Sequence, residues 1–314
     1  MKIMFLDVAS IGSDIDLSGF DALGEVKKYD YSTPEEAAER IGDADVIVIN
    51  KIPVNEKTLE KAEKLKLVCV TATGTDNLDK EYLKKRGIAW RNVAGYSTES
   101  VAQHTFALLF YLYEKLRYYD DYVKTEQYVG DRSFTHFGNV FHEISGKTWG
   151  IIGLGAIGKR VADLARAFGC RVIYYSTSGR NTQAGYERTE LDTLLKESDI
   201  VSVHAPLTDN TRGLMNKAAF QKMKQTAVFL NVGRGAIVVE KDLAEALERG
   251  EIAAAGLDVL SAEPMREDNP LRELKDSGRL LITPHIAWAS VEARTRLMDI
   301  ILHQIMDFFE QKEE

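Results

Sequence analysis

The sequence is poor in cysteine and lacks a long apolar run. Its 314 residues include two cysteines, Cys69 and Cys170, and both lie in or beside apolar, strand-like segments. Two cysteines so placed do not suggest a disulfide framework, and we expect reduced core thiols of a cytoplasmic protein rather than a disulfide or a metal pair. The apolar runs are too short to span a bilayer. The amino terminus, MKIMFLDVAS, has the pattern of a strand and a polar loop rather than of a signal peptide.

An excess of positive charge is also lacking. The chain has 40 Lys and Arg against 48 Asp and Glu, a net charge of −8. This balance argues against nucleic acid and against a membrane surface as partners. Hydrophobic residues make up 45% and charged residues 28%, as in ordinary globular proteins. The length is sufficient for two domains with substantial cores.

Residues 148–169, TWGIIGLGAIGKRVADLARAFG, form the most informative stretch that is present. The apolar run 149–152 predicts a buried parallel strand, and an amphipathic helix follows Gly153, Gly155 and Gly158. The spacing G-x-G-x-x-G suits a tight turn, close backbone approach to a pyrophosphate, and close helix–strand packing. The helix N-terminus would offer N–H groups to the phosphates. A strand before the glycines and a helix after them favour a dinucleotide site over a purely structural turn.

The first part of the chain alternates apolar runs with helical patterns, which predicts a parallel α/β domain. We expect strands at 3–8, 46–50, 67–72 and 88–92, and helices at 33–41 and 55–64 with Thr33 and Asn55 as N-caps. Thr73, Gly74 and Thr75 follow the third strand, at the sheet edge where ligands bind. The alternative for this segment is a turn in which Asp76 or Asp79 caps the next helix.

A second series of strands and helices occupies the rest of the chain up to residue 287. A long apolar helix is expected over 97–116, and its His104 is interpreted as a hydrogen-bonded core histidine. Residues 118–147 lack periodicity and predict an irregular interface loop, whose Phe134, Phe137 and Phe141 a partner subunit would cover. Further predicted strands are 171–175, 200–204, 227–231, 253–258 and 280–283. Further predicted helices are 190–197, 217–223, 240–249 and 290–310, the last packing on the first domain.

The position that selects the cofactor holds a serine. In dinucleotide-binding folds an acidic residue about 20 positions after the glycines binds the ribose hydroxyls. Ser176 stands there, followed by Thr177, Ser178 and Arg180. Without a carboxylate a 2′-phosphate is not repelled, and Arg180 could pair with it. The hydroxyls can equally serve an unphosphorylated ribose, so we expect NAD(H) and leave NADP(H) open.

Three polar residues follow predicted strands of the second series. They are Arg234 in NVGRG, Glu263 in LDVLSAEP and His285 in TPHIAW. All three fall on the carboxyl side of parallel strands, where active sites form. Beside a nicotinamide they would supply a carboxylate anchor and a proton donor, as a 2-hydroxy acid dehydrogenase requires.

The order of these landmarks resembles the D-isomer-specific 2-hydroxyacid dehydrogenase family over essentially the whole chain. The matching segments are ATGTDNLD, SVAQHT, GLGAIG, HAPLTDNTRGLMN, NVGRGAIV, GLDVLSAEP and TPHIAWAS. NKIPV, ATGTDN and TPHIAWAS place the chain nearest the glycerate dehydrogenase, or hydroxypyruvate reductase, branch. Ser176 departs from the family pattern, in which many members have aspartate.

The resemblance implies an α/β fold of two doubly wound parallel-sheet domains with a cleft between them. Residues 1–98 with 288–314 would form a flavodoxin-like substrate domain, and residues 99–287 a Rossmann dinucleotide-binding domain. It also implies a homodimer without a metal and a catalytic triad of Arg234, Glu263 and His285. The cofactor-binding set is Gly153, Gly155, Ala156, Ile157, Gly158, Ser176, Ala205, Pro206, Thr211, Val232, Gly233, Arg234, Asp258 and His285. The substrate-binding set is Lys51, Thr73, Gly74, Thr75, Arg234 and Trp288.

The expected reaction interconverts a D-2-hydroxy acid and its 2-oxo acid, with hydroxypyruvate or glyoxylate as the first candidates. Alternatives are a D-lactate- or phenyllactate-type enzyme and a 3-phosphoglycerate or formate dehydrogenase. An end at Glu314 leaves no room for an appended regulatory domain, which we expect to disfavour the phosphoglycerate enzyme. A dinucleotide-sensing corepressor or scaffold is the alternative of another class, and binding of cofactor without turnover would support it.

Overall fold

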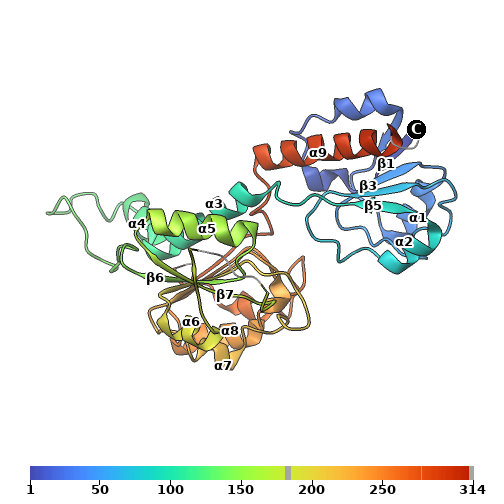
Figure 1. Ribbon diagram of the computed structural model, residues 1–314. Coiled ribbons are helices and arrows are strands. Elements are labelled where there is room, and N and C mark those ends of the chain that lie inside the picture. The colour runs from blue at the N-terminus through green and yellow to red at the C-terminus, as the bar shows by residue number, and fades with distance from the viewer. Residues whose placement is uncertain (181–184, 277, 311–314) are drawn as a thin grey trace. The chain divides into compact units, whose positions relative to one another are not determined.

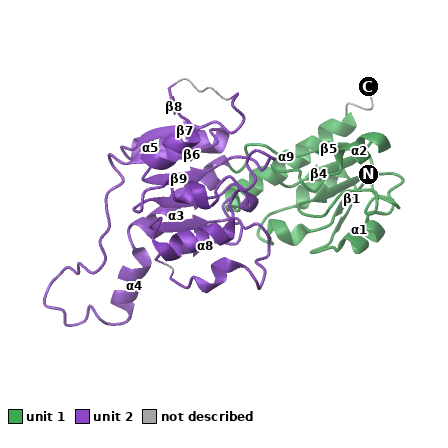
Figure 2. Cartoon of the chain, turned by 90° about the horizontal axis from the view of Figure 1, so that it is seen from below, with its two compact units in different colours: residues 1–97, 288–314 green, residues 98–287 purple. Residues whose placement is uncertain are grey.

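The computed structural model describes residues 1–180, 185–276 and 278–310 of the chain. The chain forms two compact units, drawn in different colours in Figure 2. Unit 1 comprises Met1–Ser97 and Trp288–Glu314, and unit 2 comprises Thr98–Ala287. Each unit has its own parallel sheet and its own core.

Unit 1 is built on a five-stranded parallel sheet in the order β2-β1-β3-β4-β5. The strand order reverses between β1 and β3, as in flavodoxin-like doubly wound sheets. The sequence pattern predicted four of these strands and missed the edge strand β2, whose Glu-Val-Lys-Lys composition has no apolar run. The strands are β1 (Lys2–Phe5), β2 (Glu25–Lys28), β3 (Val46–Ile49), β4 (Leu67–Val70) and β5 (Ala89–Arg91).

Alternate residues of these strands enter opposite layers, as the period of two requires. Ile3 and Phe5 pack with the long helix α9 (Val291–Glu310) and with the short 3₁₀ helices η1 (Val8–Ile11) and η2 (Ser18–Leu23). Met4 and Leu6 face the other layer, with α1 (Pro34–Ile41) and α2 (Lys80–Arg86). The prediction that the last helix packs on the first domain is confirmed.

Side chains cap the first turns of α1 and α2 in unit 1. Thr33 and Glu36 form a capping box at α1, with Pro34 as the first helical residue, as predicted. Asp79 caps α2 by accepting the N–H of Tyr82 at 2.9 Å. The alternative prediction for the segment after β4 was a turn in which Asp76 or Asp79 caps the next helix. For Asp79 this prediction is confirmed.

The helix predicted over residues 55–64 does not form. Asn55 does accept the N–H of Thr58 as an N-cap would, but the chain continues as turns. The buried side chains Leu59, Ala62 and Leu65 recur every three residues. This spacing matches tighter, three-residue turns rather than an α-helix of 3.6 residues per turn.

Unit 2 is built on a seven-stranded parallel sheet in the order β12-β11-β10-β9-β6-β7-β8. Counted from β6, the strands run 3-2-1-4-5-6-7, the order of a Rossmann sheet extended by one strand. The short edge strand β8 was not predicted. The strands are β6 (Thr148–Ile152), β7 (Arg171–Tyr175), β8 (Glu187–Arg188), β9 (Ile200–Val203), β10 (Val228–Asn231), β11 (Ala254–Leu257) and β12 (Leu280–Ile282).

Helices cover both faces of the unit 2 sheet (Figure 1). One face has α3 (Thr98–Tyr113) and α5 (Ala156–Ala167), and the other has α6 (Leu191–Glu197), α7 (Lys217–Phe220) and α8 (Glu240–Arg249). Short 3₁₀ helices, η3 (Gly235–Ile237) and η4 (Pro270–Glu273), lie in the connections. The doubly wound α/β architecture predicted from the sequence is confirmed in both units.

The segment predicted to be irregular begins with a helix. α4 (Leu116–Lys124) follows α3 after a break at Lys115, so the prediction that residues 118–124 are irregular is wrong. Its apolar residues recur on one face, but none of them is buried in the chain. Residues 125–143 then extend from unit 2 without helix or strand, and we call residues 116–143 the arm.

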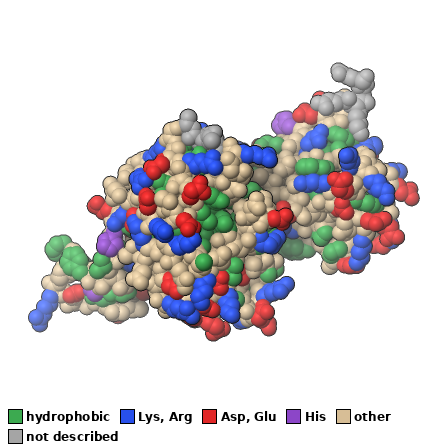
Figure 3. Space-filling model, turned by 60° about the horizontal axis from the view of Figure 1, so that its bottom comes forward, with side chains coloured by type: hydrophobic (Ala, Val, Ile, Leu, Met, Phe, Trp, Pro, Cys, Tyr) green, Lys and Arg blue, Asp and Glu red, His purple; other side chains and the backbone are tan. Residues whose placement is uncertain are grey.

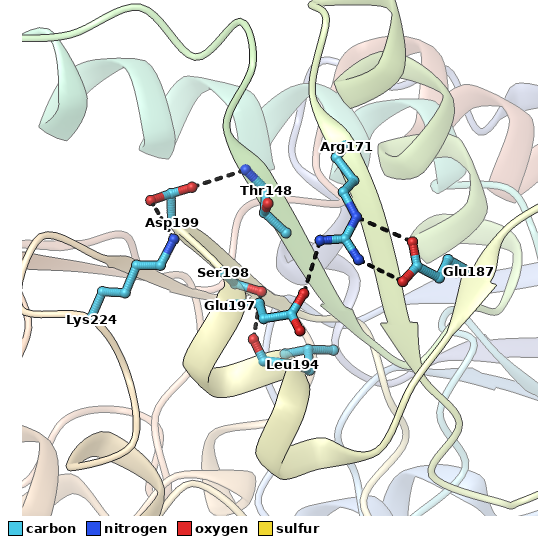
Figure 4. Close-up of polar contacts among 8 residues, drawn as sticks. All are labelled: Thr148, Arg171, Glu187, Leu194, Glu197, Ser198, Asp199 and Lys224. Carbon is cyan, nitrogen blue, oxygen red and sulfur yellow. Dashed lines mark hydrogen bonds and ion pairs between the residues drawn. The ribbon is translucent and has the colours of Figure 1, made fainter.

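Ion pairs and hydrogen bonds connect elements at the amino-terminal edge of the unit 2 sheet (Figure 4). Arg171 bridges Glu187 of β8 and Glu197 of α6, with N–O distances of 2.6 and 2.8 Å. Asp199 accepts the N–H of Thr148 at 2.9 Å and pairs with Lys224 at 2.8 Å. The predicted functional residues of unit 2 lie at the opposite, carboxyl edge of the sheet.

Candidate active site

The glycine motif lies at the point where the unit 2 strand order reverses. Gly153 has a φ of +93°, and a Cβ there would lie 2.9 Å from the Cα of Ala205 in the loop after β9. A Cβ on Gly158 would lie 2.2 Å from the carbonyl oxygen of Gly153. These two glycines are therefore required by the turn and by close helix–strand packing.

Gly155 differs from its neighbours because the space around it is open. A Cβ there would meet no heavy atom within 4 Å, and Gly155 is the N-cap of α5 without a side-chain cap. Ala156, Ile157 and Gly158 form the first turn of that helix. An open backbone at a helix N-terminus fits the pyrophosphate of a dinucleotide, so the residues present suit the cofactor.

Two further loops reach the same edge. Ala205 and Pro206 follow β9, and Thr211 fixes that loop by donating its hydroxyl to the Pro206 carbonyl at 2.8 Å. Val232 and Gly233 follow β10, and a Cβ on Gly233 would lie 3.1 Å from the Ala205 carbonyl. The predicted cofactor residues of these two loops are therefore close to one another and to Gly153.

Ser176 directly follows β7 and is 5% exposed. Its carbonyl accepts the N–H of Gly179, which closes a turn over residues 176–179. Arg180 follows this turn and donates its backbone N–H to the Ser178 hydroxyl. The position of the usual ribose-binding acid is thus occupied by a small buried hydroxyl.

His285 and Glu263 form a close pair at the carboxyl edge. The His285 Nδ1 lies 2.7 Å from the Glu263 Oε2, while Oε1 of the same carboxylate accepts the N–H of Leu260 at 2.9 Å. Both side chains remain partly exposed, at 25% and 33%. With Nδ1 held by the carboxylate, Nε2 is the ring atom that can exchange a proton with a substrate.

Asp258 supports the turn that presents His285. Its buried carboxylate accepts the N–H groups of Ile286 at 2.9 Å and Ala287 at 2.8 Å. Its carbonyl accepts the His285 N–H at 2.8 Å. Asp258 was predicted to bind the cofactor, and its supporting role was not predicted because the bonded groups are separated from it by nearly thirty residues.

Arg234 lies in the turn after β10. Its Nη1 donates to the Gly233 carbonyl at 2.9 Å, and Asn231 donates to the Arg234 carbonyl at 3.1 Å. A Cβ on Gly235 would lie 1.9 Å from the Leu260 carbonyl carbon. The Arg234 turn therefore packs directly against the loop that leads to Glu263.

In unit 1, Lys51 lies at the reversal of strand order between β1 and β3. The buried carboxylate of Asp7 accepts the N–H groups of Asn50 at 2.9 Å and Lys51 at 2.8 Å. Asn77 donates to the Ile52 carbonyl at 2.8 Å. Burial raises the pKa of Asp7, while the N–H groups of Lys51 and Asn50 oppose that rise. This clamp was not predicted from the sequence, although a carboxylate two residues after the end of β1 was a signal for it.

The other substrate candidates of unit 1 are also held in place. Thr73 donates its hydroxyl to the Val93 carbonyl at 2.8 Å, and Asn92 donates to the Thr73 carbonyl at 2.7 Å. Both the hydroxyl and the carbonyl of Thr73 are thus engaged within unit 1. Trp288 packs edge-on against Tyr96, with ring centroids 6.3 Å apart.

Over residues 1–180, 185–276 and 278–310, no group of three or more His, Cys, Asp or Glu side chains could hold a metal ion. Within the same residues, every helix is too short or too polar to cross a membrane. Cys69 and Cys170 are both free and buried, and burial raises the pKa of their thiols to about 12 and about 11.

A Rossmann sheet with an open glycine turn, together with a His–Glu pair at the same edge, defines a nicotinamide-dinucleotide-dependent oxidoreductase. Comparison with known proteins makes the class specific. Residues 106–287 match the family described as D-isomer specific 2-hydroxyacid dehydrogenase, NAD binding domain. The chain belongs to this family, so the predicted family, enzyme class and NAD cofactor are confirmed.

Named relatives cover nearly the whole chain. A hydroxypyruvate reductase of Blautia hydrogenotrophica is 38% identical over 98% of this chain and 97% of its own length. A glycerate dehydrogenase of Methylorubrum extorquens is 35% identical over 100% of this chain and 98% of its own length. The structure of an Aquifex aeolicus D-lactate dehydrogenase with NAD and lactic acid has a TM-score of 0.85, at 29% identity over 98% and 96% of the two chains.

Proposed function

We propose that this dehydrogenase reduces hydroxypyruvate or glyoxylate to the corresponding 2-hydroxy acid with NADH. The observation that supports the chemistry most strongly is the His285–Glu263 pair, with Nδ1 and Oε2 2.7 Å apart at the carboxyl edge of the unit 2 sheet. The names of the two relatives support the substrate, since glycerate dehydrogenase and hydroxypyruvate reductase describe one reaction in its two directions.

The bound nicotinamide would supply the hydride for the 2-oxo carbon. His285, as imidazolium, donates the proton from Nε2 to the forming alkoxide, and the neutral ring accepts it in the reverse direction. Glu263 holds Nδ1 and so fixes the orientation of the ring. Arg234 binds the substrate carboxylate through its planar guanidinium.

Unit 1 would contribute the rest of substrate recognition. The backbone of residues 73–75 binds a carboxylate oxygen, and the clamp of Asp7 and Asn77 holds the loop that presents Lys51. A lysine ammonium suits the hydroxyl of hydroxypyruvate better than the methyl group of pyruvate. Trp288 would line the same side-chain pocket.

A panel of 2-oxo acids tests this proposal. Glyoxylate, hydroxypyruvate, pyruvate and phenylpyruvate should be assayed separately with NADH and NADPH. The proposal expects the largest kcat/KM for hydroxypyruvate or glyoxylate. A preference for pyruvate or phenylpyruvate would support the lactate- or phenyllactate-type alternative, and oxidation of 3-phosphoglycerate would support the phosphoglycerate enzyme. Cofactor binding without any turnover would favour a sensor or scaffold.

The cofactor choice should respond to Ser176. In Ser176→Asp, kcat/KM for NADPH is expected to fall by about 10-fold or more, because placing a carboxylate against a 2′-phosphate costs at least about 1.4 kcal/mol. The kcat/KM for NADH should change little or rise, because the carboxylate can accept hydrogen bonds from both ribose hydroxyls. Ser176→Ala is the control, since it removes the hydroxyl without adding charge. Equal losses with both cofactors in Ser176→Asp would contradict a role in selection.

A cytoplasmic homodimer completes the proposal. Phe134 and Phe137 of the arm are 89% and 92% exposed, and Phe141 is half exposed. Apolar side chains gather on the arm, which extends at the lower left in Figure 3. Such a surface is unfavourable in water, and a second copy of the chain is the proposed cover. The free, buried thiols of Cys69 and Cys170 accord with a reducing compartment.

Phe137→Glu should weaken this dimer. Burying a carboxylate in an apolar contact is unfavourable, so the dimer dissociation constant is expected to rise at least about 10-fold. Sedimentation velocity over a concentration series measures it. Tyr31→Glu is the matched control, because Tyr31 is a 76% exposed aromatic residue of unit 1 outside the arm. A monomeric wild type, or a dimer unchanged by Phe137→Glu, would contradict the proposed surface.

A further inference from the structure

Helix α3 contacts both ends of the segment that contains His285. Ser100 and His104 are four residues apart and so lie on the same face of the helix. The Ser100 hydroxyl donates to the Ala287 carbonyl at 2.7 Å. The His104 Nε2 lies 2.9 Å from the Thr283 hydroxyl oxygen. One helix face thus contacts the residues two positions before and two positions after His285.

The direction of the hydrogen bonds follows from the donors available. Thr283 donates its only hydroxyl hydrogen to the Asp258 Oδ1 at 2.6 Å, since an ionised carboxylate can only accept. The Thr283 oxygen must then accept from His104, which places a hydrogen on the His104 Nε2. Burial lowers the pKa of His104, while the nearby Asp258 opposes this shift. A neutral ring protonated at Nε2 satisfies the whole chain of bonds.

This chain of hydrogen bonds ends at the Asp258 carboxylate, which shapes the turn that contains His285. Asp258 is 1% exposed, and its carboxylate also accepts the N–H groups of Ile286 and Ala287. His285, directly before these two residues, has a φ of +57°, in the left-handed region that residues with a Cβ rarely adopt. Such a conformation persists when the surrounding bonds determine it. Thr283, itself bonded to His104, donates to the carboxylate that supplies these bonds.

We propose that His104 and Thr283 are positioning residues for the proton transfer, because their hydrogen-bond chain to Asp258 holds His285 at its working orientation. The proposal rests on the proposed catalytic role of His285. It differs from the interpretation of His104 as a core histidine, under which its loss would reduce stability and leave kcat per folded molecule unchanged.

Isosteric substitutions of the full-length enzyme test this proposal, with NADH and the 2-oxo acid that the wild type reduces fastest. Thr283→Val removes the hydroxyl at constant shape, and kcat is expected to fall about 10- to 100-fold, because a small misplacement of a catalytic group has an effect of that order. KM and the Kd for NADH should stay within about threefold. Thr283→Ser restores the hydroxyl and should return kcat to near the wild-type value.

His104 provides a second, independent pair of variants. His104→Met removes the donor and should lower kcat over the same range, while His104→Gln places an amide N–H near the Nε2 position and should recover most of it. The double variant His104→Met with Thr283→Val should be no slower than the slower single variant, since one chain is broken in either case. If His104→Met fails to fold, the Thr283 pair decides the question alone.

Thr105→Val is the matched control for loss of a buried hydroxyl in α3. Thr105 is fully buried, and its hydroxyl bonds within the helix to the Val101 carbonyl. Its kcat should equal that of the wild type. Wild-type kcat in Thr283→Val, or an equal loss in Thr105→Val, would overturn the positioning role while an inactive His285→Ala still supported the proposed function. Near-wild-type kcat in His285→Ala would instead overturn the proposed function, and the positioning role with it.

Discussion

Replacement of His285 by alanine is expected to lower kcat for 2-oxo acid reduction by about 10²–10⁴-fold, the usual contribution of a positioned proton donor. The Glu263 carboxylate would then have no ring to hold, and the alkoxide would have to take its proton from water. The Kd for NADH should stay within a few-fold of the wild-type value, because the glycine turn and the loops after β9 and β10 are unchanged. Steady-state assays and NADH fluorescence titration measure the two quantities.

A surface histidine provides the control for this prediction. His303 lies exposed on α9, where its Nδ1 bonds to the Asp299 carbonyl of the preceding turn. His303→Ala should leave kcat unchanged. Near-native kcat in His285→Ala would mean that another group protonates the substrate.

Arg234 should separate substrate binding from cofactor binding. Arg234→Lys keeps the charge but loses one of two parallel hydrogen bonds to a carboxylate, so kcat/KM for 2-oxo acids is expected to fall about 10- to 100-fold. Arg234→Gln also loses the charge, so its kcat/KM for 2-oxo acids should fall further. In both variants the Kd for NADH should change by a smaller factor than kcat/KM.

The matched control is Arg212, an exposed arginine in the loop after β9. Arg212→Lys should leave kcat/KM for every 2-oxo acid unchanged. If Arg234→Lys behaved in the same way, the guanidinium would not bind the substrate carboxylate, and the assigned role of Arg234 would be wrong.

Local patterns were sufficient to predict most of the fold. The run 171–175 and the helix 240–249 were predicted with the bounds that the structure has, because a buried strand and a capped amphipathic helix each leave a periodic signal. Thr33 and Pro34 identified the start of α1, because an N-cap residue followed by proline is a local signal for a helix start. The segment 55–64 was predicted wrongly, because its polar cap is present but its buried residues follow a three-residue spacing.

The supports of the candidate site were beyond such patterns. Asp7 bonds to Lys51 across 44 residues, and His104 bonds to Thr283 across 179. Neither pair has a local period or a fixed spacing, since strand order in a doubly wound sheet brings distant loops to one edge. Glu263 and His285 were identified from their places after predicted strands and from the family resemblance, and the structure adds the 2.7 Å distance between them and how their turn is held.

The most direct test of the central claim follows the transferred hydrogen. Hydroxypyruvate should be incubated with the full-length protein and NADH that has deuterium in both C4 positions, and the product analysed by mass spectrometry and chiral chromatography. We expect D-glycerate with one deuterium at C2, formed by the wild type and about 10²–10⁴-fold more slowly by His285→Ala. Unlabelled product, the L-isomer, or NADH binding without consumption of any 2-oxo acid would contradict the assignment.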